Sequence, residues 1–114
     1  MIKAKININK AKDIISVSVM GHADSSEYGE DIICAAVSIY LTNTISTLTD
    51  IVKVEDFIEY EIGEGHFLLN VYYDNLCLEK KKETALILES LKLALTSVED
   101  SYGKYIKIVT EEVQ

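Results

Sequence analysis

The alternation of apolar and polar residues along the chain predicts seven elements of secondary structure. Apolar residues at every second position over 2–8 have the period of a half-buried strand, and Ile15, Val17 and Val19 repeat that pattern. Apolar residues spaced by three and four over 34–48, and again over 87–98, follow one face of a helix. In chain order, we expect strands and helices at residues 2–8, 15–19, 31–50, 57–62, 67–73, 79–102 and 105–109.

The order ββαββαβ predicts an α+β fold in which two helices pack on one mixed or antiparallel sheet. A polar turn at residues 9–13 would join the first two strands as an antiparallel hairpin, and a turn at residues 63–65 would join the next two. Gly103 follows the last helix and is predicted to end it in the left-handed conformation. The chain has 114 residues, 48% of them apolar, which suits one domain over residues 1–114.

The charge of the chain limits the partners that it can bind. Nineteen acidic residues against 11 basic ones give a net charge of −8. Proteins that bind nucleic acid neutralise phosphates with lysine and arginine, so direct binding to RNA or DNA is not expected. An acidic surface favours encounters with a basic partner, although the same charge could simply aid solubility.

Hydropathy and cysteine content predict a cytoplasmic protein without a membrane segment. The longest apolar stretches are far shorter than the roughly 20 residues of a membrane-spanning helix. The alternating N-terminus lacks the continuous apolar core of a signal peptide. The two cysteines are therefore expected as thiols and not as part of a disulfide framework.

A potential nucleophile and a potential base flank a polar segment that begins at Gly21. Asp31 is predicted to cap the first helix, which would place Cys34 in the first helical turn. The helix dipole and free amide groups there would stabilise a thiolate and could donate to an oxyanion. His22, at the end of the second strand, could accept the thiol proton if the following loop folds back over the helix.

Each of these residues also has a structural interpretation. Cys34 could be a small buried apolar residue, as cysteines often are. Asp31 could orient the His22 imidazole instead of capping the helix. Ser38, one turn beyond Cys34, could hydrogen-bond near the sulfur or simply face solvent.

The remaining cysteine and histidine carry weaker signals. Cys77 lies between two leucines and is expected to pack, and His66 follows a predicted turn and is expected at the surface. A metal site is conceivable, but its ligands lack the spacing of known motifs; they would be His22, Asp24, Cys34 and His66. No glycine-rich phosphate loop is present, so we expect neither a metal nor a cofactor.

The same segment resembles the signature of the ribosomal-processing cysteine proteases of the Prp family. The resemblance rests on Gly21-His22-Ala23, then Tyr28-Gly29, then Asp31-Ile32-Ile33-Cys34-Ala35-Ala36-Val37-Ser38. The length and the ββαββαβ order also match. The resemblance implies that Cys34 is the nucleophile and His22 the general base. It also implies that residues 24–30 form a mobile lid that admits peptide.

The resemblance implies a function as well. Members of the family resemble endopeptidases that remove an N-terminal extension from bacterial large-subunit ribosomal protein twenty-seven, and they look like homodimers. Leu86 and Leu93, which lie off the apolar stripe of the second helix, are candidates for the contact between copies. The alternative function is a non-catalytic ribosome-assembly protein that holds a basic ribosomal precursor. A thiol redox sensor is a more distant third.

Overall fold

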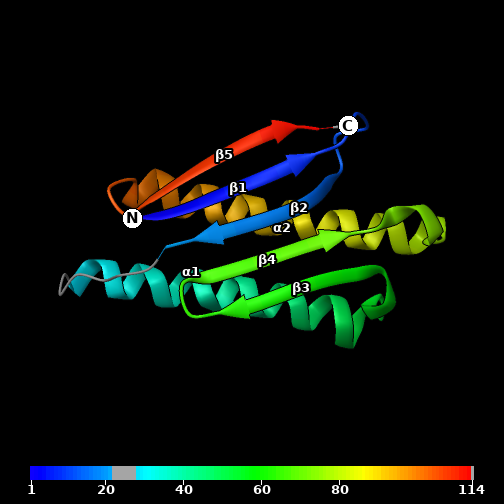
Figure 1. The fold of residues 1–114 in the computed structure, drawn as a ribbon, viewed down its shortest axis with the longest axis horizontal. Helices are drawn as coiled ribbons and strands as arrows, with labels where there is room; N and C mark the ends of the chain where they lie inside the picture. Colours follow the sequence, from blue (N-terminus) through cyan, green and yellow to red (C-terminus); the bar gives the residue numbers. More distant parts are fainter. Residues whose placement is uncertain (22–27, 114) are drawn as a thin grey trace.

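The computed structural model describes residues 1–21 and 28–113, with the backbone alone described for residues 28–31. Five strands and two long helices follow the predicted order (Figure 1). Their bounds are β1 Ile2–Ile8, β2 Ile14–Met20, α1 Tyr28–Ser46, β3 Ile58–Gly63, β4 His66–Val71, α2 Leu78–Tyr102 and β5 Ile106–Glu112. Short helical turns lie at Thr47–Ile51, Glu55–Phe57 and Tyr73–Asn75. The predicted ββαββαβ order is therefore confirmed.

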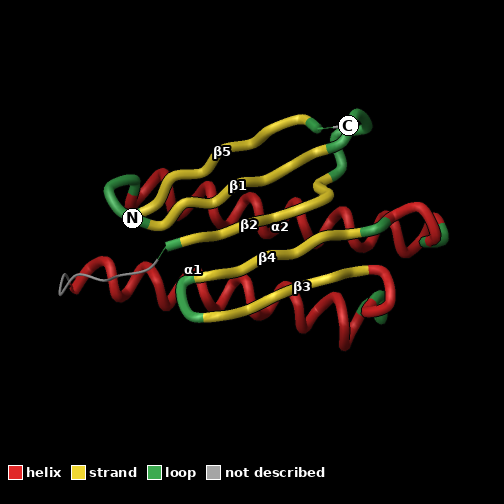
Figure 2. The backbone as a smooth tube through the Cα atoms, in the orientation of Figure 1, coloured by secondary structure: helices red, strands yellow, loops and turns green. Residues whose placement is uncertain are grey.

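The strands form a single mixed sheet in the order β3-β4-β2-β1-β5. β1 runs parallel to β5, and every other neighbouring pair is antiparallel. Both helices lie on the same face of this sheet, with α1 on the side of β3 and β4 and α2 on the side of β1 and β5 (Figures 1 and 2). No described helix covers the other face of the sheet. The α+β architecture with two packed helices agrees with the sequence prediction.

The core lies between the sheet and the two helices. Alternate residues of the central strands point into it, and helical residues spaced by three and four close it from the other side. Its most deeply buried members are Ile6, Ile14, Val17, Leu48, Leu69, Leu88, Leu95 and Ile106. The outer face of α1 is rich in serine and threonine, which are weak helix formers. The helix is therefore held in place by the burial of its apolar residues Val37, Leu41 and Ile45.

Two local predictions are wrong. The register of the β1–β2 hairpin shifts between Asn7 and Ile8, so Ile14 is buried in place of Ile15 at the start of β2. Gly103 is right-handed, with φ −58° and ψ −13°, and not a left-handed cap. A Cβ at Gly103 would lie 3.0 Å from the carbonyl oxygen of Glu99, so close approach and not a positive φ favours glycine there.

One helical segment corrects the expectation that every apolar run is too short for a membrane. Within the described residues, Ile32–Ile51 is long and apolar enough to span a bilayer by length and composition, with a mean hydropathy of 1.5. In the structure 33% of this segment is buried: Val37, Leu41 and Ile45 belong to the core, whereas Ile39 and Ile51 are exposed. The core helix of a globular protein passes the same test of length and hydropathy.

Candidate active site

α1 begins at Tyr28, three residues before the predicted start, and this changes the setting of Cys34. Asp31 lies inside the helix, so the prediction that it is the N-cap is wrong. Cys34 lies beyond the first turn, where amide groups belong to the internal hydrogen-bond ladder and the dipole effect has declined. The predicted use of the Cys34 amide as an oxyanion donor therefore loses its basis. Residues 28–31 lack an apolar stripe, so periodicity could not detect this first turn.

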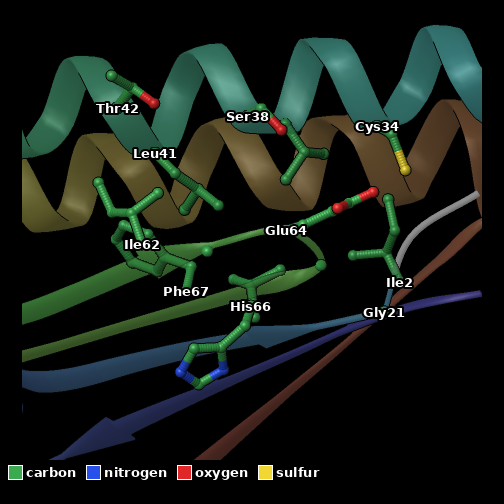
Figure 3. A pocket seen from close by; sticks show the side chains of 14 residues that line it. Ile2, Gly21, Cys34, Ser38, Leu41, Thr42, Ile62, Glu64, His66 and Phe67 are labelled. Atoms are coloured by element: carbon green, nitrogen blue, oxygen red, sulfur yellow. The ribbon is translucent and has the colours of Figure 1, made fainter.

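A cavity of about 260 Å³ lies between α1 and the β3–β4 hairpin. One wall is the helix, which contributes Cys34, Val37, Ser38, Leu41 and Thr42. The opposite wall is the hairpin, from Ile62 to Phe67. The ends of the first two strands close the cavity with Ile2, Val19 and Gly21 (Figure 3). Most of the described residues that line the cavity are apolar.

Cys34 is half-buried on the cavity side of α1, and both cysteines are in the reduced form. Its sulfur points from the helix toward the end of the cavity formed by Ile2 and Gly21 (Figure 3). Ser38 lines the same wall one turn further along, which is the place that its spacing predicted. A thiol on the wall of a cavity is accessible to a ligand held there, which a core cysteine would not be.

Gly21 has a conformation and a contact that no other residue could adopt without strain. Its φ is +97°, and a Cβ would lie 2.4 Å from the carbonyl oxygen of Met1. Its amide donates a hydrogen bond to the carbonyl of Gly65 at 3.0 Å, which joins the end of β2 to the turn of the β3–β4 hairpin. The sequence analysis places Gly21 at the start of the polar segment. The structure shows why this residue is glycine: its φ is positive and Met1 lies too close for a side chain.

Several predicted site residues lie outside the described part of the chain. His22 and Ala23 are not described, and for Tyr28, Gly29 and Asp31 only the backbone is. The base at His22, the orienting role of Asp31 and the lid over residues 24–30 therefore stay predictions.

His66 lies on the face of the sheet away from the helices, as expected of a surface residue. It pairs with Met20 across β4 and β2, and its Nδ1 lies 3.1 Å from the sulfur of Met20. Its Nε2 lies 3.2 Å from a carboxylate oxygen of Glu61. Figure 3 shows the ring directed away from α1, so it does not face Cys34.

The other cysteine does not occupy the packed position that its leucine neighbours suggested. Cys77 is exposed and directly precedes α2, so the prediction that it packs is wrong. Among residues 1–21 and 32–113, no group of acidic, histidine or cysteine side chains is placed to hold a metal ion. The metal site imagined around His22 and Asp24 falls on residues outside that part, so its absence stays a prediction.

Glu64 is the titratable residue, among the described residues that line the cavity, that the sequence analysis does not assign to the site. Gly63-Glu64-Gly65 was recognised as a turn, but nothing in the sequence placed it next to Cys34. The strand order does so, because β4 pairs with β2 and thereby brings the turn to Gly21. The turn at residues 63–65 can therefore be assigned to the site only when the pairing of β4 with β2 is known.

Comparison with known proteins identifies the family to which a chain with this fold and this cysteine belongs. Residues 1–107 match the sequence profile of the family described as cysteine protease Prp. The chain belongs to the Prp family of cysteine proteases. The resemblance recognised in the sequence is therefore confirmed, and the protein is a cysteine protease.

Relatives with known roles match almost the whole chain. The ribosomal processing cysteine protease Prp of Staphylococcus aureus is 30% identical over 108 residues, which are 95% of this chain and 97% of that protein. A crystal structure of the S. aureus Prp with a substrate peptide has a TM-score of 0.81 and 26% identity, covering 96% of this chain and 99% of that one. A second, with a covalently linked product peptide, has a TM-score of 0.80, 28% identity and the same coverage, 96% and 99%.

Substitution of Gly21 tests the close approach that shapes the cavity. We expect Gly21→Ala to lower the free energy of unfolding by about 2–4 kcal/mol, because it adds both a left-handed strain and a clash with Met1. Urea denaturation followed by circular dichroism measures the change. Gly63→Ala is the matched control, since nothing lies within 4 Å of its Cβ position, and it should stay within about 0.5 kcal/mol of the unaltered protein. Equal losses for both variants would contradict the argument.

Proposed function

We propose that the protein is an endopeptidase that removes the N-terminal extension of large-subunit ribosomal protein twenty-seven. The observation that carries the proposal is the Cys34 thiol on the wall of a cavity, in a chain of the Prp family. The S. aureus relative is named a ribosomal processing protease and has been crystallised with a substrate peptide. A ribosomal precursor is also a basic protein, and the net charge of −8 favours its encounter with this chain.

In this proposal Cys34 is the nucleophile and His22 the general base. The imidazole takes the thiol proton, and the sulfur attacks the scissile carbonyl carbon to form a tetrahedral intermediate. The C–N bond breaks as His22 returns the proton to the leaving amine, which leaves a thioester on Cys34. Water then attacks the thioester, its proton passes to His22 and from there to the sulfur, and the acid product leaves. The covalently linked product peptide of the S. aureus Prp supports a covalent route.

The position of the pair along the chain supports their cooperation. Gly21 forms part of the cavity wall, and the sequence puts His22 one peptide bond beyond it. Gly21 follows β2 with a φ of +97°, which glycine adopts without strain, and it lines the same cavity as Cys34. His66, the other histidine, is held on the far face of the sheet and does not compete for this role.

The proposal extends to where and in what state the enzyme works. We place it in the cytoplasm, where ribosomal proteins are made, as a homodimer without direct contact to nucleic acid. Leu86 and Leu93 are 72% and 68% exposed on the side of α2 opposite its buried residues. An apolar pair on one exposed helix face suits a contact between two copies.

Replacing the proposed nucleophile separates a protease from a binding protein. We expect Cys34→Ala to abolish cleavage of the ribosomal protein precursor, by about 1,000-fold or more, because no other group supplies the thioester. Mass analysis of the precursor before and after incubation measures this. Cys77→Ala is the matched control and should cleave normally. Cleavage at the full rate by Cys34→Ala would contradict the proposal, and binding without turnover by the unaltered protein would favour the non-catalytic alternative.

Charge placed on the exposed face of α2 tests the dimer. We expect the double variant Leu86→Asp, Leu93→Asp to sediment as a monomer and the unaltered protein as a dimer, because two buried carboxylates would oppose the apolar contact. Leu78→Asp is the control, since Leu78 is 67% exposed at the first residue of the same helix. A double variant that remains dimeric would exclude this face as the interface.

A further inference from the structure

The turn of the β3–β4 hairpin carries a carboxylate into the cavity that holds Cys34. Glu64 and Gly65 are the two residues of this turn, since the residues on either side of them pair with each other in the sheet. The Gly65 carbonyl accepts the hydrogen bond from Gly21, which fixes the turn against the end of β2. Figure 3 shows the Glu64 side chain extending from the turn toward Cys34 and Ile2.

The surroundings leave the Glu64 carboxylate available to a ligand. Among the described lining residues, the others that carry a titratable group are Cys34 and His66, and the ring of His66 points away to Glu61. The rest of the described wall is apolar or carries hydroxyl groups. Within the described part of the chain, no hydrogen bond or ion pair engages Glu64. From the described lining residues, a bound peptide would therefore meet one unpaired negative charge, in the same cavity as the thiol.

The size of the cavity limits what reaches that charge. At about 260 Å³ it is smaller than the roughly 300–1,000 Å³ of pockets that enclose a drug-sized ligand. It therefore accommodates one or two side chains that flank the bond attacked by Cys34, and not a long segment. A lysine or arginine there would form a charge-assisted hydrogen bond with Glu64, and an aspartate or glutamate would be repelled.

We propose that Glu64 is a specificity residue that favours substrates with a lysine or arginine within two residues of the cleaved bond. The inference rests on the proposed peptidase function of the same cavity. It differs from the attraction that a net charge of −8 exerts on any basic protein, because that attraction acts over the whole surface and does not depend on position. Glu64 distinguishes substrates only by the charge of the residues beside the cleaved bond.

Peptides of identical composition separate these two effects. Each pair of peptides spans the cleavage region of the ribosomal precursor and exchanges one lysine and one glutamine, so that the lysine lies either beside the cleaved bond or at the far end. One pair tests each side of the bond. Both members carry the same net charge, so the ratio of their kcat/KM values reports the position alone. The unaltered protein, Glu64→Gln and Glu64→Lys are compared, with Glu61→Gln as a control that removes the same charge from the opposite sheet face.

We expect the unaltered protein and Glu61→Gln to prefer the near lysine by about threefold to fivefold in at least one pair, the range of an exposed ion pair. Glu64→Gln should bring that ratio to about one, and Glu64→Lys should reverse it. Added salt should shrink the preference, since the charges are exposed. Thermal melting followed by circular dichroism confirms that each variant folds.

Two results would overturn the inference in different ways. The absence of any preference in the unaltered protein, or a preference that survives in Glu64→Lys, would show that Glu64 does not read the substrate while leaving the peptidase intact. Failure of the unaltered protein to cleave any of the peptides would contradict the proposed function itself, and the inference would fall with it.

Discussion

Three separate parts of the chain meet at Gly21, and the cavity exists because they can approach so closely. The carbonyl oxygen of Met1 lies where a side chain of residue 21 would begin, only 2.4 Å from an ideal Cβ. The amide of Gly21 also donates a hydrogen bond of 3.0 Å to the Gly65 carbonyl in the hairpin turn. The start of β1, the end of β2 and the β3–β4 turn are thereby fixed around one point. Hydrogen bonding and the lack of a Cβ together set the position of every wall except the helix.

The helix wall follows from the geometry of an apolar stripe. Ile33, Val37 and Leu41 are buried in the core and fix the rotation of α1 on the sheet. Cys34 and Ser38 lie at the edge of that stripe, four residues apart, so they share the side that faces the hairpin. Cys34 is consequently half-buried, held by packing on one side and open to the cavity on the other. Its place depends on the core and not on the first turn of the helix.

Periodicity predicted the order of the elements because most strands and helices have one buried face. It failed where the local cause is not an apolar stripe. The first turn of α1, around Asp31, has no such stripe. Ile14 is buried where the alternation predicts Ile15, because the register of β2 shifts against its partner strand β1. Glu64 could not be assigned to the site, because only the pairing of β4 with β2 brings its turn to Cys34. The family motif supplied the role of His22, which spacing along the chain left open.

The central claim is that Cys34 forms the covalent intermediate, and trapping that intermediate tests it most directly. The protein is mixed with the precursor peptide, quenched in acid within the first turnover, digested and mapped by mass spectrometry. Cys77 is exposed and Cys34 only half-buried, so accessibility alone would favour modification of Cys77. We predict a thioester that joins the removed N-terminal fragment to Cys34 and leaves Cys77 unmodified. A fragment attached to Cys77, or cleavage that proceeds with no adduct on Cys34, would contradict the account.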